Sequence, residues 1–173
     1  MEAANLARAL AELHAASYGW ALACSGRDAG AASDVLQQAY WKVLEGKARF
    51  DGRSSLKTWF FSVIRWTAAE QRRSVVRLFR RASPHEEERE SPASSSAKPD
   101  RKTERAEIAA RLSSALAKLA PRQREVLHLV FYEELSVADA AAILGVSVGS
   151  ARQHYDRGKT RLKELLADEH GTP

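Results

Sequence analysis

The sequence has few of the features that define secreted proteins, metalloproteins and enzymes. Cys24 is the only cysteine among 173 residues, so no intramolecular disulfide can form and a reducing cytoplasm is the expected location. The five histidines are scattered, with no pair at metal-ligand spacing. No set of nucleophile, base and orienting residue is evident. We therefore expect a protein that is not an enzyme and that needs no metal and no cofactor.

Long apolar runs and strand patterns are also missing. The longest apolar run, near Trp59, is too short to span a bilayer, and no charged-then-apolar signal stands at the N-terminus, so no membrane insertion is expected. Apolar residues recur at helical spacing and β-branched residues are sparse, which predicts an all-α fold. Lys and Arg number 27 against 22 Asp and Glu, and this formal charge of +5 favours a polyanionic partner.

The clearest pattern lies in residues 135–166, LSVADAAAILGVSVGSARQHYDRGKTRLKELL. Ser136 is expected to cap a short helix over residues 137–144, which Gly145 ends because glycine adopts the left-handed conformation without a Cβ clash. Ser147 then caps a second helix with one apolar stripe, Val148, Ala151, Tyr155, Gly158, Leu162 and Leu165. The rest of that helix is polar and mostly basic. The pattern predicts a helix-turn-helix whose second helix enters a DNA major groove.

An ordinary helical hairpin with a solvated face is the structural alternative for this stretch. Two features favour DNA binding instead. Asp156 is the only acid in the first two turns of the exposed face, and Ser147, Gly149 and Ser150 are small enough to let a backbone approach phosphate.

The N-terminal part is predicted to form three helices. Residues 3–22 form an Ala/Leu-rich helix that either runs on or breaks near Gly19, and residues 26–32 form a turn. A second helix starts at Ser33 and Asp34, runs to about Glu45 and is ended by Gly46. Trp41 is a large aromatic on an otherwise polar face of that helix. It is either covered by another helix or exposed as an interface anchor.

The third helix begins after Ser54 or Ser55 and reaches Ser74. One of its faces is predicted to be core, with Leu56, Trp59, Phe60, Val63 and Thr67. The opposite face is small, polar and basic, with Thr58, Ser62, Arg65, Ala69, Arg72 and Arg73, and is flanked by Phe61 and Trp66. Rings beside a basic face are typical of single-stranded nucleic acid binding, although an aromatic helix can also be simply core.

The composition changes from Ser74, where a basic run passes into Pro84, an acidic cluster and SPASSSAKPD. Low hydrophobicity with Ser, Pro and charge predicts a flexible linker over 74–105, between domains 1–73 and 106–173. Its r.m.s. span would be roughly 30 Å, and its fully extended span at most about 105–115 Å. Since one duplex turn is about 34–36 Å, the domains could engage sites one to three turns apart.

The C-terminal domain is predicted to contain four helices in all. The first begins at about Glu104, with a buried face formed by Ile108, Leu112, Ala115, Leu116 and Leu119. Pro121 opens the next helix, whose apolar side comprises Val126, Leu127, Leu129, Val130 and Tyr132. The helix-turn-helix supplies the other two.

Two strings resemble a known family. Residues 119–166, and PRQREV, the LS start and ILGVSVGS in particular, resemble region 4 of the extracytoplasmic-function sigma factors of bacterial RNA polymerase. Residues 33–74 resemble region 2, including the aspartate before an apolar pair and the loop leading into a Trp-aromatic helix. The helix-turn-helix motif alone is shared with many regulators, whereas the two strings in this order are far more specific.

The resemblance implies three interaction surfaces. The polymerase clamp helices would be met by Asp34, Gln37, Gln38 and Trp41. The melted proximal promoter element would be held by Asp51, Gly52, Arg53, Ser54, Ser55, Lys57, Thr58, Phe61, Ser62, Arg65 and Trp66. The distal element would be read as duplex by Ser150, Arg152, Gln153, His154 and Arg157, with Arg122 and Arg124 on its phosphates.

The implied function is that of a sigma factor that directs core RNA polymerase to promoter DNA, and an anti-sigma factor is a further partner usual for the family. Three residues depart from the family pattern: Gln38 stands where Glu is usual, Trp66 where Asn is common, and Ala140 where a bulkier apolar residue is common. The main rival is a helix-turn-helix regulator that never binds polymerase. A small all-α enzyme is the third reading, and it would need convergent titratable residues in a pocket.

Overall fold

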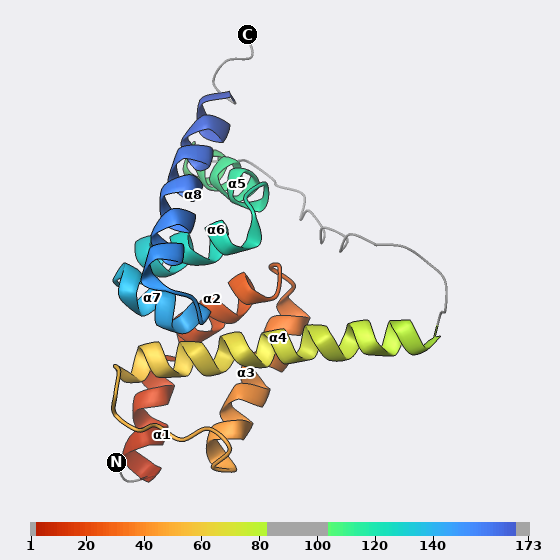
Figure 1. Ribbon diagram of the computed structural model, residues 1–173, viewed down its shortest axis with the longest axis vertical. Helices are drawn as coiled ribbons and strands as arrows, with labels where there is room; N and C mark the ends of the chain where they lie inside the picture. Colours follow the sequence, from red (N-terminus) through yellow and green to blue (C-terminus); the bar gives the residue numbers. More distant parts are fainter. Residues whose placement is uncertain (1–2, 83–103, 169–173) are drawn as a thin grey trace. The chain divides into compact units, whose positions relative to one another are not determined.

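The computed structural model describes residues 3–82 and 104–168, and every regular element in these ranges is a helix (Figure 1). The chain divides into two compact units, residues 1–94 and residues 95–173. The predicted all-α class is confirmed. Within the described ranges no helix is both long and apolar enough to cross a membrane.

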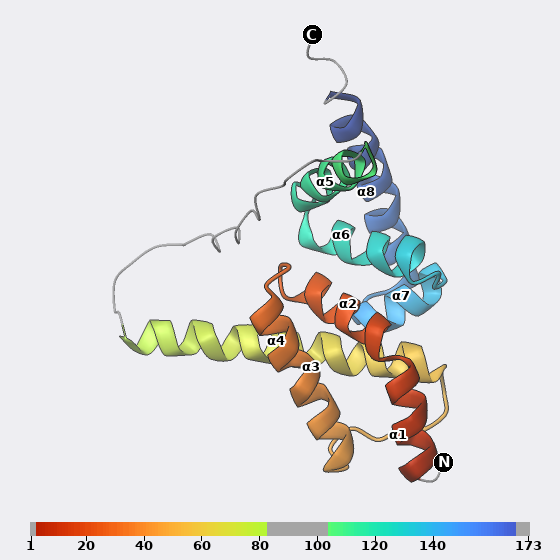
Figure 2. The ribbon, with the colours of Figure 1, turned by 180° about the vertical axis from the view of Figure 1, so that it is seen from behind.

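The N-terminal unit contains four helices, α1 (Ala3–Glu12), α2 (His14–Cys24), α3 (Ala29–Leu44) and α4 (Leu56–Ala82). In both ribbon views α4 crosses α2 and α3 (Figures 1 and 2). Large rings form its core: Trp20, Phe60 and Phe61 are fully buried. The indole Nε1–H of Trp20 donates to the Phe61 carbonyl oxygen at 3.0 Å, and the two rings stack with centroids 5.9 Å apart.

Two predicted boundaries in this unit are wrong. The first helix is interrupted at Leu13 rather than near Gly19, which lies inside α2. The break lets α2 bury Ser17, Trp20, Ala21 and Cys24. Helix α3 begins within the segment predicted as a turn, because the carboxylate of Asp28 caps it by accepting from the Ala31 amide at 2.8 Å.

Helix α4 extends further than predicted, through Ala82 into the segment assigned to the linker. Its later part passes beyond α2 and α3 in both views, and Val75, Val76 and Arg77 there are exposed (Figures 1 and 2). Low hydrophobicity predicted a segment without a packed core, and it did not exclude a helix. Helix α4 thus occupies residues 74–82 of the predicted linker, and the part of the linker over 83–103 lies outside the described residues.

The C-terminal unit comprises α5 (Glu104–Ala117), α6 (Pro121–Leu127), the π-helix η1 (His128–Tyr132), α7 (Val137–Leu144) and α8 (Val148–Asp168). Its core includes a cluster of Ala115, Leu119, Leu127 and Leu165, against which Leu116, Tyr155, Leu162 and Leu166 pack. The predicted Pro121 start of α6 is confirmed.

The predicted ends of the helix-turn-helix helices are confirmed in detail. Ser136 Oγ accepts from the Asp139 amide at 3.0 Å and caps α7, and Gly145 ends α7 in the left-handed conformation with φ 65°. Ser147 Oγ accepts from the Ser150 amide at 3.0 Å at the start of α8. Side-chain caps and one left-handed glycine thus fix the angle at which α8 leaves the turn.

Several positions predicted to be buried in this unit are exposed. Ile108 and Leu112 on α5 are exposed, and so are Tyr132 and Val148. The π-helix explains Tyr132, because its wider turn carries the residue out of the register that an α-helix would give. Two acids that the sequence did not mark as core, Glu125 and Glu133, are buried.

Candidate nucleic-acid and polymerase interfaces

The outer surface of α8 carries the residues predicted to read duplex DNA. Arg152, Gln153 and Arg157 are exposed, and Ser150 and His154 are half-buried. With 3.6 residues per turn, Ser150, His154 and Arg157 fall on one flank of the buried stripe and Arg152 falls on the other. The helix therefore presents two polar edges rather than one basic face.

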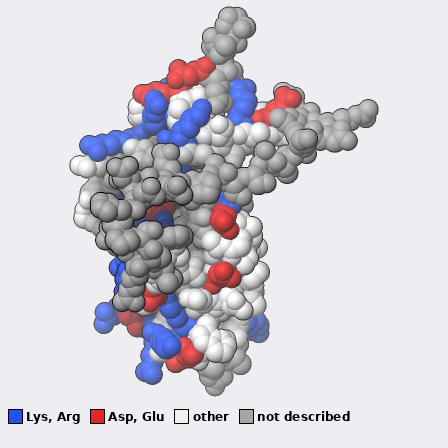
Figure 3. Space-filling model, turned by 90° about the vertical axis from the view of Figure 1, so that its right-hand side faces the viewer, with Lys and Arg blue, Asp and Glu red and all other residues white. Residues whose placement is uncertain are grey.

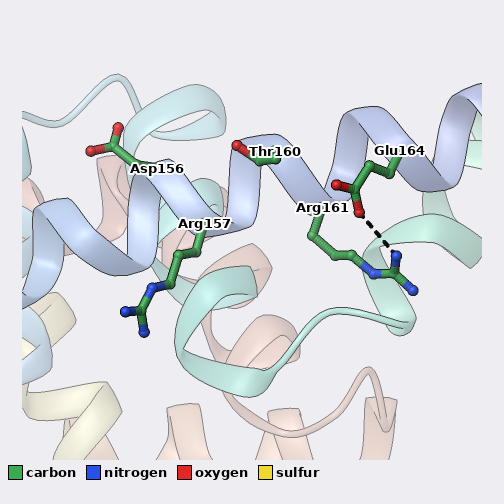
Figure 4. Close-up of a pocket in the computed structure, with 5 residues that line it drawn as sticks. All are labelled: Asp156, Arg157, Thr160, Arg161 and Glu164. Atoms are coloured by element: carbon green, nitrogen blue, oxygen red, sulfur yellow. Dashed lines mark hydrogen bonds and ion pairs between the residues drawn. The ribbon is translucent and has the colours of Figure 1, made fainter.

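Arg157 differs from the next two basic residues on α8, Lys159 and Arg161. Arg161 Nη1 bonds to Glu164 Oε2 at 3.0 Å, and Lys159 Nζ lies 5.2 Å from the Tyr155 ring centroid. Figure 4 shows this ion pair as a dashed line, whereas Arg157 extends away from both Asp156 and Glu164. The guanidinium of Arg157 is thus directed outward, where a planar cation with five donors can meet a base edge or a phosphate.

The two arginines predicted to meet phosphates bond to their own chain. Arg122 Nη1 donates to the Leu144 carbonyl at 3.3 Å and lies 3.4 Å from Glu125 Oε2, which ties α6 to the end of α7. Arg124 Nη1 donates to the Ala117 carbonyl at 3.4 Å. Both side chains are half-buried, so any phosphate contact would use the donors that remain.

In the N-terminal unit, the loop before α4 is polar and exposed from Asp51 to Ser55. Asp51 Oδ1 accepts from the Arg53 amide at 3.1 Å, and Gly52 adopts φ 75°. The Arg53 side chain is 89% exposed and lies 3.3 Å from Asp51 Oδ2. Ser55 Oγ caps α4 by accepting from the Thr58 amide at 3.0 Å. Lys and Arg side chains reach the surface of both units, with Asp and Glu among them (Figure 3).

Some of the α4 residues predicted to hold the melted promoter element are buried. Phe61 is fully buried against Trp20, and Thr58 is 2% exposed. The expectation that their side chains are available to DNA is wrong, because α4 turns Phe61 as well as Phe60 into the core. Lys57 is half-buried, with Nζ 5.5 Å from the Phe61 ring centroid. Ser62 and Arg65 are half-buried, and Trp66 is 55% exposed.

The four residues predicted to meet polymerase lie together on one exposed face of α3, namely Asp34, Gln37, Gln38 and Trp41. Trp41 is 61% exposed, so the alternative that a helix of the described chain covers it is wrong. The Lys47 ammonium, 2.7 Å from Glu45 Oε2, lowers the pKa of Glu45, and Trp41 contributes a smaller change in the same direction.

The contacts of Lys42 with α4, next to the exposed Trp66, were not predicted from the sequence. Lys42 of α3 donates to Thr67 Oγ1 at 3.1 Å and to Glu70 Oε2 at 2.6 Å, and its Nζ lies 4.0 Å from the centroid of the Trp66 ring. The hydrogen bond from Lys42 lowers the pKa of Glu70, with further contributions from the charges of Lys42, Arg73 and Arg77. No short-range sequence pattern links these residues, since they meet only when α3 packs on α4.

Comparison with known proteins accounts for both units. The sequence matches Sigma-70 region 2 over residues 10–83 and Sigma-70, region 4 over residues 106–162. It is 30% identical over 155 residues to the "Probable RNA polymerase sigma-C factor" of Mycobacterium bovis, which covers 86% of this chain and 76% of that protein. It is 28% identical over 142 residues to "RNA polymerase sigma factor CarQ" of Myxococcus xanthus, covering 82% and 78%.

Two solved structures are also similar. The sigma factor RpoE, crystallised with the anti-sigma factor NepR from Bartonella quintana, aligns with a TM-score of 0.73 at 26% identity and covers 94% of this chain and 97% of that one. CnrH, solved in complex with the cytosolic domain of CnrY, shares the fold at 22% identity with a TM-score of 0.61. With region 2 and region 4 in the expected order, the chain belongs to the extracytoplasmic-function sigma factors, which act in transcription initiation with RNA polymerase.

Proposed function

We propose that this sigma factor reads the distal promoter element as duplex through α8 and captures the melted proximal element with α4 and the loop before it. The observation that carries the proposal is the capped helix-turn-helix, whose second helix directs Arg157 outward. A helix held in this way fits the width of the major groove.

The proposed chemistry of α8 is direct readout. Arg157 or Arg152 bonded to both acceptors of a guanine would contribute about 1–3 kcal/mol of discrimination. Ser147 and Ser150 at the helix start are small, and the positive end of the helix dipole there favours a phosphate. Arg122 and Arg124 would contribute phosphate contacts that position the unit without reading sequence.

The proposed chemistry of the N-terminal unit is capture of a single strand. Flipping a base out of the stack costs a few kcal/mol, and stacking on an aromatic side chain offsets about 1–3 kcal/mol per base. Since Phe61 belongs to the core, Trp66 is the ring we assign to this role on α4. Arg53, Lys57 and Arg65 would meet the phosphates, while Ser54, Ser55 and Ser62 supply hydroxyls.

We assign the exposed face of α3 to core RNA polymerase, with Trp41 as the anchor because tryptophan is enriched at binding hot spots. Trp41→Ala should weaken capture of core polymerase by about 30-fold or more, since hot-spot truncations cost about 2 kcal/mol or more. Leu44→Ala is the matched control, because Leu44 is exposed on the same helix and lies outside the assigned set. Retention by Trp41→Ala equal to that of the unsubstituted chain would remove Trp41 from the interface.

An anti-sigma factor is the further partner that we propose. The similar RpoE and CnrH structures are both complexes, the first with a protein described as an anti-sigma factor. Co-purification of the tagged chain from its native host would identify such a protein, and the purified partner should block binding to core polymerase.

In vitro transcription tests the whole proposal. The purified chain and core polymerase are incubated with a random-sequence promoter library, and the transcribed templates are sequenced. We expect two enriched elements separated by a fixed spacing. Arg157→Ala should relax the preference in the distal element alone, whereas Arg161→Ala, which removes an arginine paired with Glu164, should leave it unchanged. No transcript from any template would overturn the proposal.

A further inference from the structure

The interior of the α3–α4 contact holds a lysine beneath an exposed tryptophan. The Lys42 side chain is only 14% exposed, and all three of its contacts are on α4. Thr67 Oγ1 is free to accept from Lys42 because its own hydroxyl donates to the Val63 carbonyl at 2.8 Å. Glu70 Oε2, at 2.6 Å, balances the charge. Lys42 is therefore committed to α4 rather than available to a phosphate.

The third contact of Lys42 is with the ring of Trp66. At 4.0 Å from the ring centroid, the ammonium lies well within the roughly 6 Å range of cation–π attraction. It covers one face of the indole, yet Trp66 remains 55% exposed. One face of the Trp66 ring is thus restrained by the Lys42 ammonium, which is itself fixed by two hydrogen bonds.

We propose that Lys42 is a positioning residue for base capture: by holding one face of the Trp66 ring it orients the indole so that the exposed face stacks on an unpaired base of the melted promoter strand. The inference rests on the proposed function of Trp66. Ordering a side chain on binding weakens affinity by about 2- to 10-fold. A tryptophan already held in place avoids most of that loss.

A purely structural role for Lys42 is the competing explanation, since the same contacts join α3 to α4. The two roles differ in how a substitution at Lys42 depends on Trp66. A structural contact acts whether or not the ring is present, whereas a positioning contact has nothing to position once the ring is gone. A double-mutant cycle separates the two.

The test uses full-length chain bound to core polymerase. The probe is a promoter fragment recovered from the library, in duplex form and with a preformed single-stranded bubble over its proximal element. Trp66→Ala should weaken binding to the bubble probe by about 5- to 100-fold. Lys42→Met, which keeps the apolar stem, should weaken it by about 3- to 10-fold when Trp66 is intact and not at all when it is combined with Trp66→Ala. Lys42→Arg should restore binding, because it keeps a cation over the ring.

Each result decides between the claims. Unchanged bubble binding by Trp66→Ala would refute the proposed function of Trp66. If Trp66→Ala weakens binding but Lys42→Met has no effect, or has the same effect in both backgrounds, the positioning role is refuted while base capture by Trp66 stands. Thermal unfolding of each variant is measured in parallel, and Lys42→Arg provides the comparison if Lys42→Met lowers stability.

Discussion

The two units of the chain fill their cores with different kinds of residue. The N-terminal unit buries large rings, with Trp20, Phe60 and Phe61 all at 0% exposure. The described part of the C-terminal unit leaves its rings, Phe131, Tyr132 and Tyr155, at least partly exposed and buries aliphatic residues such as Val126, Leu127 and Leu129. The N-terminal core is thus built around aromatic rings, whereas the described C-terminal core is aliphatic, with a glycine, Gly158, buried where α8 packs on α6.

The two units also differ in how the core residues and the candidate site residues are distributed over their helices. In the N-terminal unit a single helix, α4, supplies two of these core rings, Phe60 and Phe61, as well as the exposed Trp66, so substitutions in it affect stability and binding together. In the C-terminal unit α8 turns Ala151 and Gly158 inward and its polar edges outward. The core residues and the candidate site residues there lie on different faces of the same helix. Substitutions of the one should change stability, and substitutions of the other should change DNA binding.

The largest expected effect is the loss of a core ring. Trp20→Ala should destabilise the N-terminal unit by about 3–5 kcal/mol, because it leaves a cavity and removes the hydrogen bond to Phe61 and the stacking contact. Hydrogen exchange of α2–α4 amides measures the change, with α6–α8 amides unaffected. Trp41→Ala is the control and should change stability by less than about 0.5 kcal/mol. Equal losses from both substitutions would contradict the aromatic core.

A second substitution tests close approach in the other unit. A Cβ on Gly158 would lie 3.1 Å from Leu127 Cδ1 and 3.2 Å from Gln123 Cβ. Gly158→Ala should destabilise the C-terminal unit by about 1–2 kcal/mol, since overpacking exceeds the gain in helix propensity.

Gly149→Ala on the same helix is the control, because its Cβ would meet only Ser147 Oγ at 3.8 Å. It should be neutral or stabilising by up to about 1 kcal/mol. Urea unfolding followed by amide exchange of α8 compares the two. A stabilising Gly158→Ala would show that the helices are not held at this separation.

The C-terminal unit was the more predictable because its signals are local. Ser136, Gly145 and Ser147 each act within three or four residues of the chain, so their roles in capping and turning could be read from the sequence and are confirmed. The π-helix was not foreseen, since nothing in HLVFY distinguishes it from a continued α-helix. Tyr132 was misplaced for that reason.

The N-terminal unit was less predictable because two rings of α4 with the same sequence pattern differ in burial: Phe61 is buried and Trp66 is exposed. Phe61 and Trp66 both flank the polar face, yet only tertiary packing against Trp20 shows that Phe61 is core. The exposed set on α3 needed no such information, since a strict helical period separates it from Val35, Leu36 and Ala39. Lys42 could not be found from the sequence, because its partners lie on another helix.

Loss of a helix N-cap should have a smaller effect on stability, and the effect should be the same in both units. Asp28 caps α3 and Ser136 caps α7 by accepting from amides at 2.8 and 3.0 Å. Asp28→Ala and Ser136→Ala should each cost about 1 kcal/mol in their own unit, measured by urea unfolding with exchange of the capped helix. Similar losses of stability from the two substitutions would show that the units differ in their cores and not in their helix caps. A loss above about 2 kcal/mol at either site would show that the cap also fixes packing.

The smallest expected effect is a pH dependence confined to the N-terminal unit. Lys42 holds the pKa of Glu70 below its usual value of about 4.5. A carboxyl with a lowered folded-state pKa stabilises the fold above its unfolded-state pKa, and this contribution is lost as pH falls through that value toward the folded pKa. Since the Glu70 side chain is 44% exposed, solvent screening keeps the contribution small.

Glu70→Gln should therefore make the acid side of the stability profile of the N-terminal unit slightly shallower below about pH 4.5, as measured by urea unfolding between neutral and acidic pH. Lys42→Met removes the cause of the shift and should flatten the same part of the profile, and combining the two should flatten it no further. The C-terminal profile serves as the internal control. If Lys42→Met leaves the profile clearly steeper than Glu70→Gln does, Arg73 and Arg77 rather than Lys42 dominate the electrostatics of Glu70, and the α3–α4 contact contributes less charge coupling than its 2.6 Å geometry indicates.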